Sequence, residues 1–291
     1  MPIEESELIL NPDGSIYHLN LQPEHISETI ITVGDPDRVN QVASHFDEIQ
    51  FKTYKREFHT QTGVYRGKRI SVISTGIGTD NIDIVLNELD ALVNIDLKKR
   101  EVKKSLTSLN IIRIGTSGAI QDNIPIDSFL ISETAVGFDS LLHFYKSSHL
   151  QNLAISKALH SHLNLHQNKS APYAVNGDSH LISHFKSDKT FTGITGTNVG
   201  FYGPQGRKLR LELQDEELNR KISSFRYNQK QITNLEMETA GIYGLSLLLG
   251  HRAISMNAII ANRKNGRFSD RPKEVVDDLI LYTLDKIVTL N

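Results

Sequence analysis

Five short segments carry the side chains best suited to chemistry, and arginine occurs in four of them. Arginine presents a planar fork of N–H donors that matches phosphate and carboxylate groups. Neighbouring glycines let the backbone turn and expose its own N–H groups. The segments are Gly34-Asp35-Pro36-Asp37-Arg38, Arg113-Ile114-Gly115-Thr116-Ser117-Gly118, Phe201-Tyr202-Gly203-Pro204-Gln205-Gly206-Arg207, Glu236-Met237-Glu238 and Asn262-Arg263.

The segment Gly34–Arg38 is typical of an anion site. It follows the β-branched stretch 29–33, and proline after a capping aspartate often begins a helix. Free N–H groups at a helix start attract anions, and Arg38 would lie one turn in and add a charged donor. An ordinary Asp-Pro helix cap with a surface arginine is the alternative.

Arg113 lies in an apolar stretch with Ile111, Ile112 and Ile114. An arginine in a buried strand is costly unless an anionic group satisfies it. We expect the strand to end there in a Gly-Thr-Ser-Gly turn, and α/β proteins bind ligands at such carboxyl ends of strands. If the strand alternates differently, Arg113 faces solvent.

Gln205 and Arg207 lie on a loop framed by glycine and proline, beside Phe201 and Tyr202. A glutamine amide both donates and accepts, whereas arginine only donates. The pair therefore suits a planar heterocycle with adjacent carbonyl and imide N–H groups, and a plain turn is the alternative.

Glu236 and Glu238 precede an apolar helical segment at 239–249. Residues two apart do not share a helix face, so an acid–base pair on that helix is not expected. In an extended segment both carboxylates could point to one side, with Met237 on the other. Helix capping is the competing interpretation. Arg263 either reaches a pocket or is exposed.

The elements that must position these segments alternate between strand and helix patterns. This alternation is typical of an α/β layered fold, and no repeat or linker divides residues 1–291, which we interpret as one domain. The charged segments 96–105 and 208–232 are expected to be solvated helix or loop. Strands are predicted at 29–33, 64–75 (a hairpin with its turn near Gly67), 109–114, 129–132, 191–196 and 253–260, and helices at 39–46, 82–93, 150–163 and 275–290.

Bulk properties exclude several function classes. The 291 residues include 32 Lys and Arg against 34 Asp and Glu, which does not favour nucleic acid or an anionic membrane as a partner. Cysteine is absent, so disulfides, thiolate zinc sites and cysteine nucleophiles are excluded. No metal-type spacing of His, Asp and Glu occurs, and the acidic N-terminus lacks a secretory pattern. We expect no metal site and a cytoplasmic protein.

In this order, the segments resemble the nucleoside phosphorylase superfamily and, within it, the uridine phosphorylases. The similarity runs from about Ile16 to the C-terminal helix. Each piece is weak alone, whereas their joint order is highly specific. The matching pieces are His18-Leu19, Val33 to Arg38, Arg56-Glu57-Phe58, Ser74 to Gly78 with Glu88-Leu89, Arg113 to Ile120, Gln205-Gly206-Arg207 and Glu236-Met237-Glu238.

The resemblance implies a role for each site residue, with Arg207, Gln205 and Arg113 as the catalytic residues. Two residues, His18 and Arg56, would act in the site of the neighbouring subunit. The implied contacts are, for phosphate, Gly34, Arg38, Arg56, Arg113 and Thr116, and, for the nucleoside, His18, Phe201, Gln205, Arg207, Glu236, Met237, Glu238 and Arg263.

The resemblance also implies a three-layer α/β/α fold with a mixed, partly barrel-like central sheet flanked by helices. It further implies a homo-oligomer with shared active sites, either a dimer or a hexamer. Purine-specific relatives typically end the late strand with Ser-Asp, and here Asn262-Arg263 stands in that place. Together with the Gln-Gly-Arg segment, this difference favours a pyrimidine.

Two departures from the family pattern bear on cofactors and assembly. Asp80-Asn81 replaces the usual Pro-Ser after Gly-Ile-Gly. Some bacterial uridine phosphorylases bind a monovalent cation with that serine and the equivalent of Glu57, so Asn81 argues against the ion here. The segment 96–108 resembles an insertion in the animal, dimeric enzymes.

The expected activity is phosphorolysis of uridine or another pyrimidine nucleoside, as in pyrimidine salvage, by a pentosyltransferase. Phosphate would attack the anomeric carbon as uracil departs, giving uracil and ribose 1-phosphate with inversion. Inorganic phosphate is then a co-substrate, and no organic cofactor is needed. The alternatives are a purine nucleoside phosphorylase, a nucleosidase of the same fold, and a catalytically idle nucleoside-binding protein.

Overall fold

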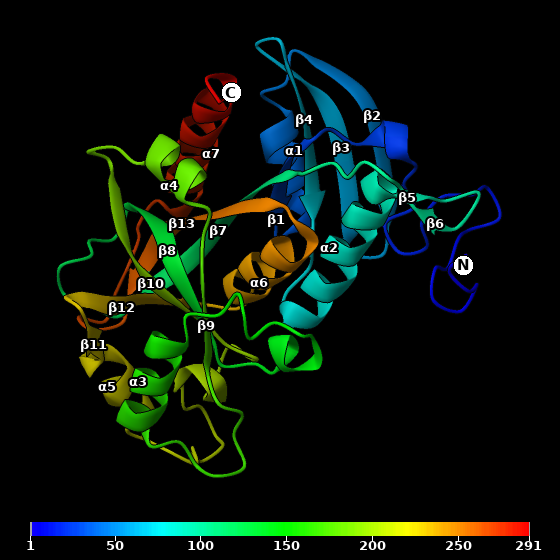
Figure 1. The fold of residues 1–291 in the computed structure, drawn as a ribbon. Helices are drawn as coiled ribbons and strands as arrows, with labels where there is room; N and C mark the ends of the chain where they lie inside the picture. The colour runs from blue at the N-terminus through cyan, green and yellow to red at the C-terminus, as the bar shows by residue number, and fades with distance from the viewer. Residues whose placement is uncertain (1, 291) are drawn as a thin grey trace.

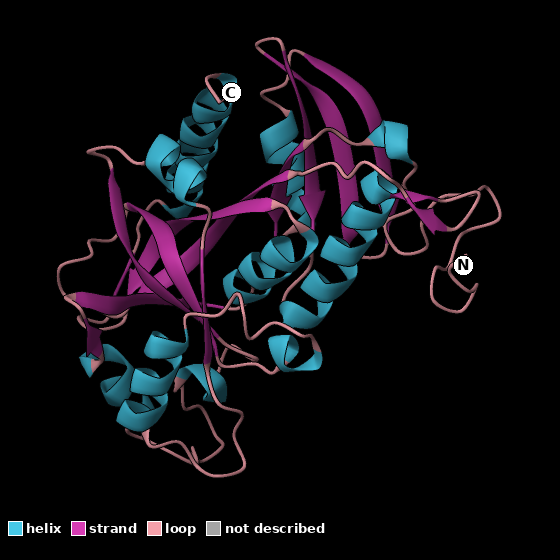
Figure 2. Cartoon of the chain, in the orientation of Figure 1, coloured by secondary structure: helices cyan, strands magenta, loops and turns pink. Residues whose placement is uncertain are grey.

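A large mixed sheet forms the centre of the computed structural model, which describes residues 2–290. Its main path runs β11-β12-β10-β8-β13-β7-β1-β4-β3-β2, and helices flank it, so the α/β prediction is confirmed (Figure 1, Figure 2). The strands are β1 (Thr29–Val33), β2 (Glu48–Lys55), β3 (Phe58–Tyr65), β4 (Lys68–Ser74), β7 (Asn110–Ala119), β8 (Phe129–Gly137), β9 (Tyr173–Asn176), β10 (Thr190–Thr197), β11 (Arg226–Tyr227), β12 (Lys230–Glu236), β13 (Arg252–Asn262) and β14 (Arg267–Phe268).

Seven α-helices are assigned within the described residues. None of them combines the length and the apolar character needed to cross a bilayer. They are α1 (Pro36–Ala43), α2 (Thr79–Asn94), α3 (Leu153–Leu163), α4 (Ser179–Phe185), α5 (Leu218–Ser224), α6 (Thr239–Leu249) and α7 (Pro272–Val288).

The central strands are apolar on both faces because helices cover both. Ile30 and Ile111 belong to one hydrophobic cluster, together with residues of α2 and α6. The next residues along each strand, Ile31 and Ile112, belong to a second cluster with residues of α1 and α7. Alternation along a strand thus sends successive side chains to opposite layers.

Five strands close into a barrel at one end of the sheet. β7, β13, β8, β10 and β12 are neighbours in that order, and β12 pairs again with β7 at Asn234↔Ala119 and Leu235↔Gly118. This closure confirms the partly barrel-like sheet. Closure also leaves five strands with an interior that side chains must fill.

The elements correct three local predictions. The expected turn at Gly115–Gly118 is wrong, because β7 continues in parallel pairing with β13 through Ala119. The segment 96–105 contains a two-stranded hairpin, β5 (Ile95–Asp96) with β6 (Glu101–Val102). In the segment 208–232, the helix α5 fits the prediction of helix or loop, whereas β11 and the start of β12 do not.

Candidate active site

A cavity of about 670 Å³ lies where several strands end at their carboxyl termini. The cavity is formed by six parts of the chain. These are the segments after β1 and β4, the last residues of β7, the β12–α6 junction, the end of β13 and the 201–207 loop. Sequence segments far apart in the chain therefore converge, as the strand-end rule for α/β sheets predicts. The predicted residues that line it are Gly34, Arg38, Arg113, Thr116, Phe201, Gln205, Arg207, Glu236, Met237 and Glu238.

The turn from β1 into α1 places Arg38 in the cavity. The carboxylate of Asp35 caps α1 by accepting from the backbone N–H of Asp37 at 2.9 Å, so the helix-cap interpretation also holds. The Nε atom of Arg38 is buried and has no hydrogen-bond partner. Desolvation, followed by the nearby Arg113 cation, lowers the pKa of Arg38. An anion placed between the two arginines would favour the charged form of Arg38 and so oppose both the desolvation and the repulsion by Arg113.

Arg113 is buried, and its guanidinium lies between two carboxylates. Its Nη2 is 2.6 Å from Glu238 Oε2 and 3.1 Å from Glu236 Oε2. Burial works to lower the pKa of Arg113, but the two carboxylates outweigh it and the pKa is raised. The solvent-facing alternative for Arg113 is therefore wrong.

Gly115 makes this position of the guanidinium possible. It lies two residues after Arg113 on β7, so the two residues face the same side of the strand. A Cβ atom on Gly115 would lie 1.9 Å from Nη1 of Arg113. The side chain of Arg113 therefore folds over a position that only glycine leaves open.

The two carboxylates at the β12–α6 junction face one side but bond differently. Glu236 accepts from the backbone N–H groups of Glu238 and Thr239, and so caps α6. Glu238 accepts from the N–H of Gly78 at 2.9 Å and from Arg113. Burial, opposed by Arg113, raises the pKa of Glu238. The prediction that both carboxylates face one side is therefore confirmed, but Met237 lines the same cavity and does not lie on the opposite side. The capping interpretation holds for Glu236.

The 201–207 loop presents polar and aromatic side chains to the cavity. Gln205 is buried, and its Oε1 accepts from Nη1 of Arg207 at 2.5 Å. The Arg207 guanidinium lies 3.8 Å from the centre of the Phe201 ring, and burial lowers its pKa. Behind the loop, Arg263 donates to the backbone carbonyl of Gln205 at 2.7 Å, and desolvation together with Arg207 lowers the pKa of Arg263 to about 10.

Three predicted residues do not line this cavity: His18, Arg56 and Arg263. Arg263 supports the loop from outside. His18 is held by Glu88 of α2, whose carboxylate accepts from the His18 backbone N–H at 3.0 Å and lies 2.6 Å from its Nδ1. Arg56, at the β2–β3 turn, lies 6.0 Å from the ring of Tyr17. His18 and Arg56 are thus both beside Tyr17.

Sequence reasoning assigned no phosphate or nucleoside contact to several other residues of the lining, including Glu57 and Asn81, which were considered only for the family's cation site. Glu57 and Asn81 both approach Gly76, where a Cβ atom would lie 3.1 Å from Glu57 Cγ and 2.4 Å from Asn81 Nδ2. The Gly76-Ile77-Gly78 segment before α2 was the sequence feature that could have indicated this part of the cavity. Several lining residues outside the five segments carry little local signal, because they are apolar: Ile77, Leu235, Ile260, Ala261 and Phe268.

The chemistry of the cavity is divided among three groups of side chains. Arg38 and Arg113 provide cationic donors for an oxyanion. Glu238 provides a carboxylate that can accept from hydroxyl groups, and Met237 lies next to it. Gln205, Arg207 and Phe201 provide a polar edge and an aromatic face for a planar ring.

Comparisons with known proteins identify the family. A family model described as Phosphorylase superfamily matches residues 28–283. A uridine phosphorylase of Thermococcus kodakarensis is 29% identical over 262 residues, covering 88% of this chain and 80% of that protein. A purine nucleoside phosphorylase, DeoD-type, of Shewanella denitrificans is 26% identical over 283 residues, covering 94% and 98%.

Among solved structures, a Trypanosoma brucei nucleoside phosphorylase described as showing uridine phosphorylase activity superposes with a TM-score of 0.88. It is 26% identical, and the match covers 97% of this chain and 100% of that one. Because the family model spans most of the sequence and the fold agrees over nearly its full length, this chain belongs to the Phosphorylase superfamily.

Proposed function

We propose that this chain is a uridine phosphorylase, which uses inorganic phosphate to convert uridine to uracil and ribose 1-phosphate. The observation that carries the proposal is the pair Arg38 and Arg113, two desolvated guanidinium groups in one cavity, one with a buried Nε that lacks a partner. The names of two relatives, from Thermococcus kodakarensis and Haemophilus influenzae, support the choice of uridine.

Phosphate would bind between Arg38 and Arg113, with the N–H groups near Gly34 and the hydroxyl of Thr116 as further donors. The arginines would hold the nucleophilic oxygen beside the anomeric carbon and so convert an encounter in solution into a reaction within one complex. The bond from phosphate oxygen to the anomeric carbon forms as the carbon–nitrogen bond breaks. The bonding electrons of the broken bond leave with uracil.

The ribose would lie against Met237, with its hydroxyl groups donating to Glu238. Glu238 accepts from Gly78 N–H and from Arg113. Its carboxylate is therefore fixed at the junction between the phosphate region and the nucleoside region. This position would orient the anomeric carbon toward the phosphate.

The uracil ring would lie against Phe201, with its carbonyl and imide groups facing Gln205 and Arg207. Negative charge develops on the ring as the carbon–nitrogen bond breaks. A charged donor held in place by Gln205 and the aromatic ring stabilises this charge more than it stabilises the neutral base, which lowers the barrier. Glu236 and Arg263 would support the site without touching the reacting atoms.

The proposal includes a homo-oligomer, because His18 and Arg56 lie outside the cavity lining and would complete a neighbouring subunit's site. Their shared position beside Tyr17 supports this assignment. We further propose that the enzyme acts in cytoplasmic pyrimidine salvage, with no organic cofactor and no interface cation.

A purine nucleoside phosphorylase is the second candidate, favoured by the 26% identity to the Shewanella denitrificans enzyme. Purine-specific sites of the family place an aspartate where this chain has Arg263. That arginine here contacts the carbonyl of Gln205 and offers no carboxylate to a purine ring.

One assay separates these activities. The protein is incubated with uridine, thymidine, inosine or adenosine, with and without phosphate, and free base is measured. Uracil release that requires phosphate supports the proposal. Release without phosphate indicates a nucleosidase, purine release indicates the second candidate, and binding without turnover indicates an idle nucleoside-binding protein.

A further inference from the structure

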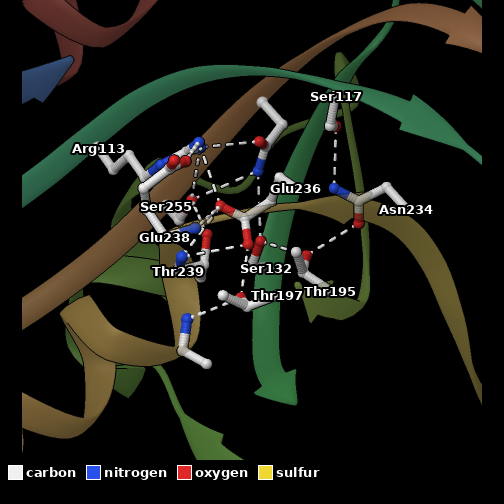
Figure 3. A network of polar contacts seen from close by, with 12 residues as sticks. Arg113, Ser117, Ser132, Thr195, Thr197, Asn234, Glu236, Glu238, Thr239 and Ser255 are labelled. Atoms are coloured by element: carbon white, nitrogen blue, oxygen red, sulfur yellow. Dashed lines mark hydrogen bonds and ion pairs between the residues drawn. The ribbon is translucent and has the colours of Figure 1, made fainter. Parts of the chain in front are cut away.

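The barrel interior contains a set of polar side chains, one from each of its five strands. All five are buried, and none is among the residues to which the proposed function gives a role. We call this set the polar ring; it consists of Ser117 (β7), Asn234 (β12), Thr195 (β10), Ser132 (β8) and Asn257 (β13), and Figure 3 shows the hydrogen bonds around it.

Hydrogen bonds connect neighbouring strands in order around the barrel. Asn234 Nδ2 donates to Ser117 Oγ at 2.9 Å, and its Oδ1 accepts from Thr195 Oγ1 at 2.8 Å. Thr195 and Ser132 share a hydroxyl–hydroxyl bond. Asn257 Nδ2 then donates to Ser132 Oγ at 3.3 Å. Four of the five neighbouring strand pairs of the barrel are thus joined by these side chains.

The last member of the polar ring, Asn257, bonds Arg113, which we propose binds phosphate. Nη1 of Arg113 donates to Oδ1 of Asn257 at 3.0 Å, while Nη2 bonds Glu238. In the sheet, Asn257 pairs with Gly115, the glycine over which the guanidinium lies. The carboxamide of Asn257 therefore lies directly beside the folded-back arginine.

The partners of Asn257 fix which way its amide points. A guanidinium only donates, so it requires the amide oxygen, and the hydroxyl of Ser132 takes the amide N–H. Buried polar groups of this kind are costly unless every one is satisfied. Apolar side chains would fill the same space without that cost, so packing alone does not account for the polar ring.

We propose that Asn257 is a positioning residue for phosphate binding, which acts by holding the Arg113 guanidinium through the amide oxygen and is itself oriented by the polar ring. As a neutral acceptor, the amide constrains Nη1 without adding a third carboxylate beside Arg113. Nη1 of Arg113 is then held by Asn257 and, at 3.5 Å, by Ser255, and Nη2 is held by the two carboxylates. The Nε–H group of Arg113, which has no hydrogen bond to the described residues, would donate to a phosphate oxygen.

This inference rests on the proposed function for its turnover assay, but inorganic phosphate alone also tests it. In Asn257→Leu, which keeps the side-chain size and removes the acceptor, we expect the Kd for phosphate by calorimetry and the phosphate KM to rise about tenfold or more. The kcat at saturating phosphate and the uridine KM should change less. A purely structural role would lower the unfolding temperature without this selective loss.

The matched control is the same substitution at Asn94, which is buried at the far end of α2 and donates to Asp90 and to the backbone carbonyl of Thr107. Asn94→Leu should lower stability and leave the Kd for phosphate unchanged. Equal losses of phosphate affinity in both variants would overturn the proposal.

A milder variant keeps the test available if Asn257→Leu does not fold. Ser132→Ala removes the hydroxyl that orients the Asn257 amide and should raise the Kd for phosphate about threefold. A Kd unchanged from that of the unmodified protein, in whichever of the two variants folds, would overturn the inference. If the unmodified protein binds phosphate but does not release uracil, the proposed function fails while the phosphate titration still decides the role of Asn257.

Discussion

Two hydrogen-bond acceptors and an aromatic ring hold the guanidinium of Arg207 in place. Gln205 accepts from its guanidinium, the carbonyl of Phe201 accepts a second bond at 2.7 Å, and the Phe201 ring covers one face. A donor fixed in this way needs little reorganisation when charge develops on a bound ring. Substitution of Arg207 should therefore test stabilisation of the leaving base separately from phosphate binding.

We predict that Arg207→Ala lowers kcat for uridine phosphorolysis by on the order of a hundredfold or more, because a charged donor to the departing base is lost. Steady-state kinetics at saturating phosphate would measure this. Lys208→Ala serves as the control, since Lys208 pairs with Glu212 and Glu216 on the surface and should leave kcat unchanged. A kcat for Arg207→Ala within threefold of normal would refute the role.

Strand β7 carries both Arg113 and Gly115, and the guanidinium of Arg113 occupies the space that a side chain at Gly115 would fill. Gly115→Ala should displace the Arg113 guanidinium, because the new methyl group would overlap Nη1. We expect a loss of about 1–3 kcal/mol in the free energy of unfolding, measured by denaturant titration, and weaker phosphate binding.

Gly118→Ala on the same strand gives the comparison for stability. A Cβ atom there would lie 3.5 Å from Arg263 Cγ and Cδ, an ordinary contact. Its unfolding free energy should change by less than about 0.5 kcal/mol. If both alanine variants unfold alike, the overlap with Arg113 is not what Gly115 avoids.

The element pattern was largely readable from the sequence where strands are apolar on both faces. β1, β4, β10 and β13 were predicted close to their observed bounds, because continuous β-branched runs carry a strong local signal. The hairpin predicted at 64–75 included only the last two residues of β3 (Phe58–Tyr65). β2 was missed because none of its side chains is fully buried and its register depends on β3. Short elements such as β9 and α4 owe their form to tertiary packing.

Local sequence signals also predicted most residues of the site, but they did not predict the residues that hold those side chains in place. Glycines and charged residues at strand ends marked Arg38, Arg113, Gln205 and Glu238 in the sequence. The continuation of β7 through Gly115 was missed, since four residues rich in Gly, Ser and Thr read locally as a turn. Pairing with β13 and, at Gly118, with β12 makes them a strand. Asn257 gave no signal, because its partners lie on β7 and β8.

In the whole molecule, His18 and Arg56 form a feature separate from the cavity. The N-terminal segment that carries His18 is anchored on α2 through Glu88 and on the β5–β6 hairpin, where Arg100 donates to the Leu8 carbonyl. We propose that this anchoring presents His18 to a neighbouring subunit.

Mixing two defective variants tests that exchange. In a mixed oligomer of His18→Ala and Arg207→Ala chains, one site combines an intact cavity with an intact neighbouring His18. Co-refolded mixtures should therefore regain activity above the sum of the separate preparations. Mixtures of Arg207→Ala with Arg113→Ala should not, because every cavity carries a lesion. No gain in mixed oligomers verified by mass would contradict the shared-site assignment.

The account depends most on Arg38 and Arg113 holding an inorganic oxyanion, and calorimetric titration with inorganic phosphate tests this most directly. We predict one phosphate bound per chain, and a Kd that rises at least about tenfold in Arg38→Ala, because a bidentate charged donor is lost. Absence of phosphate binding to the unmodified protein, or equal affinity in Arg38→Ala, would contradict the account.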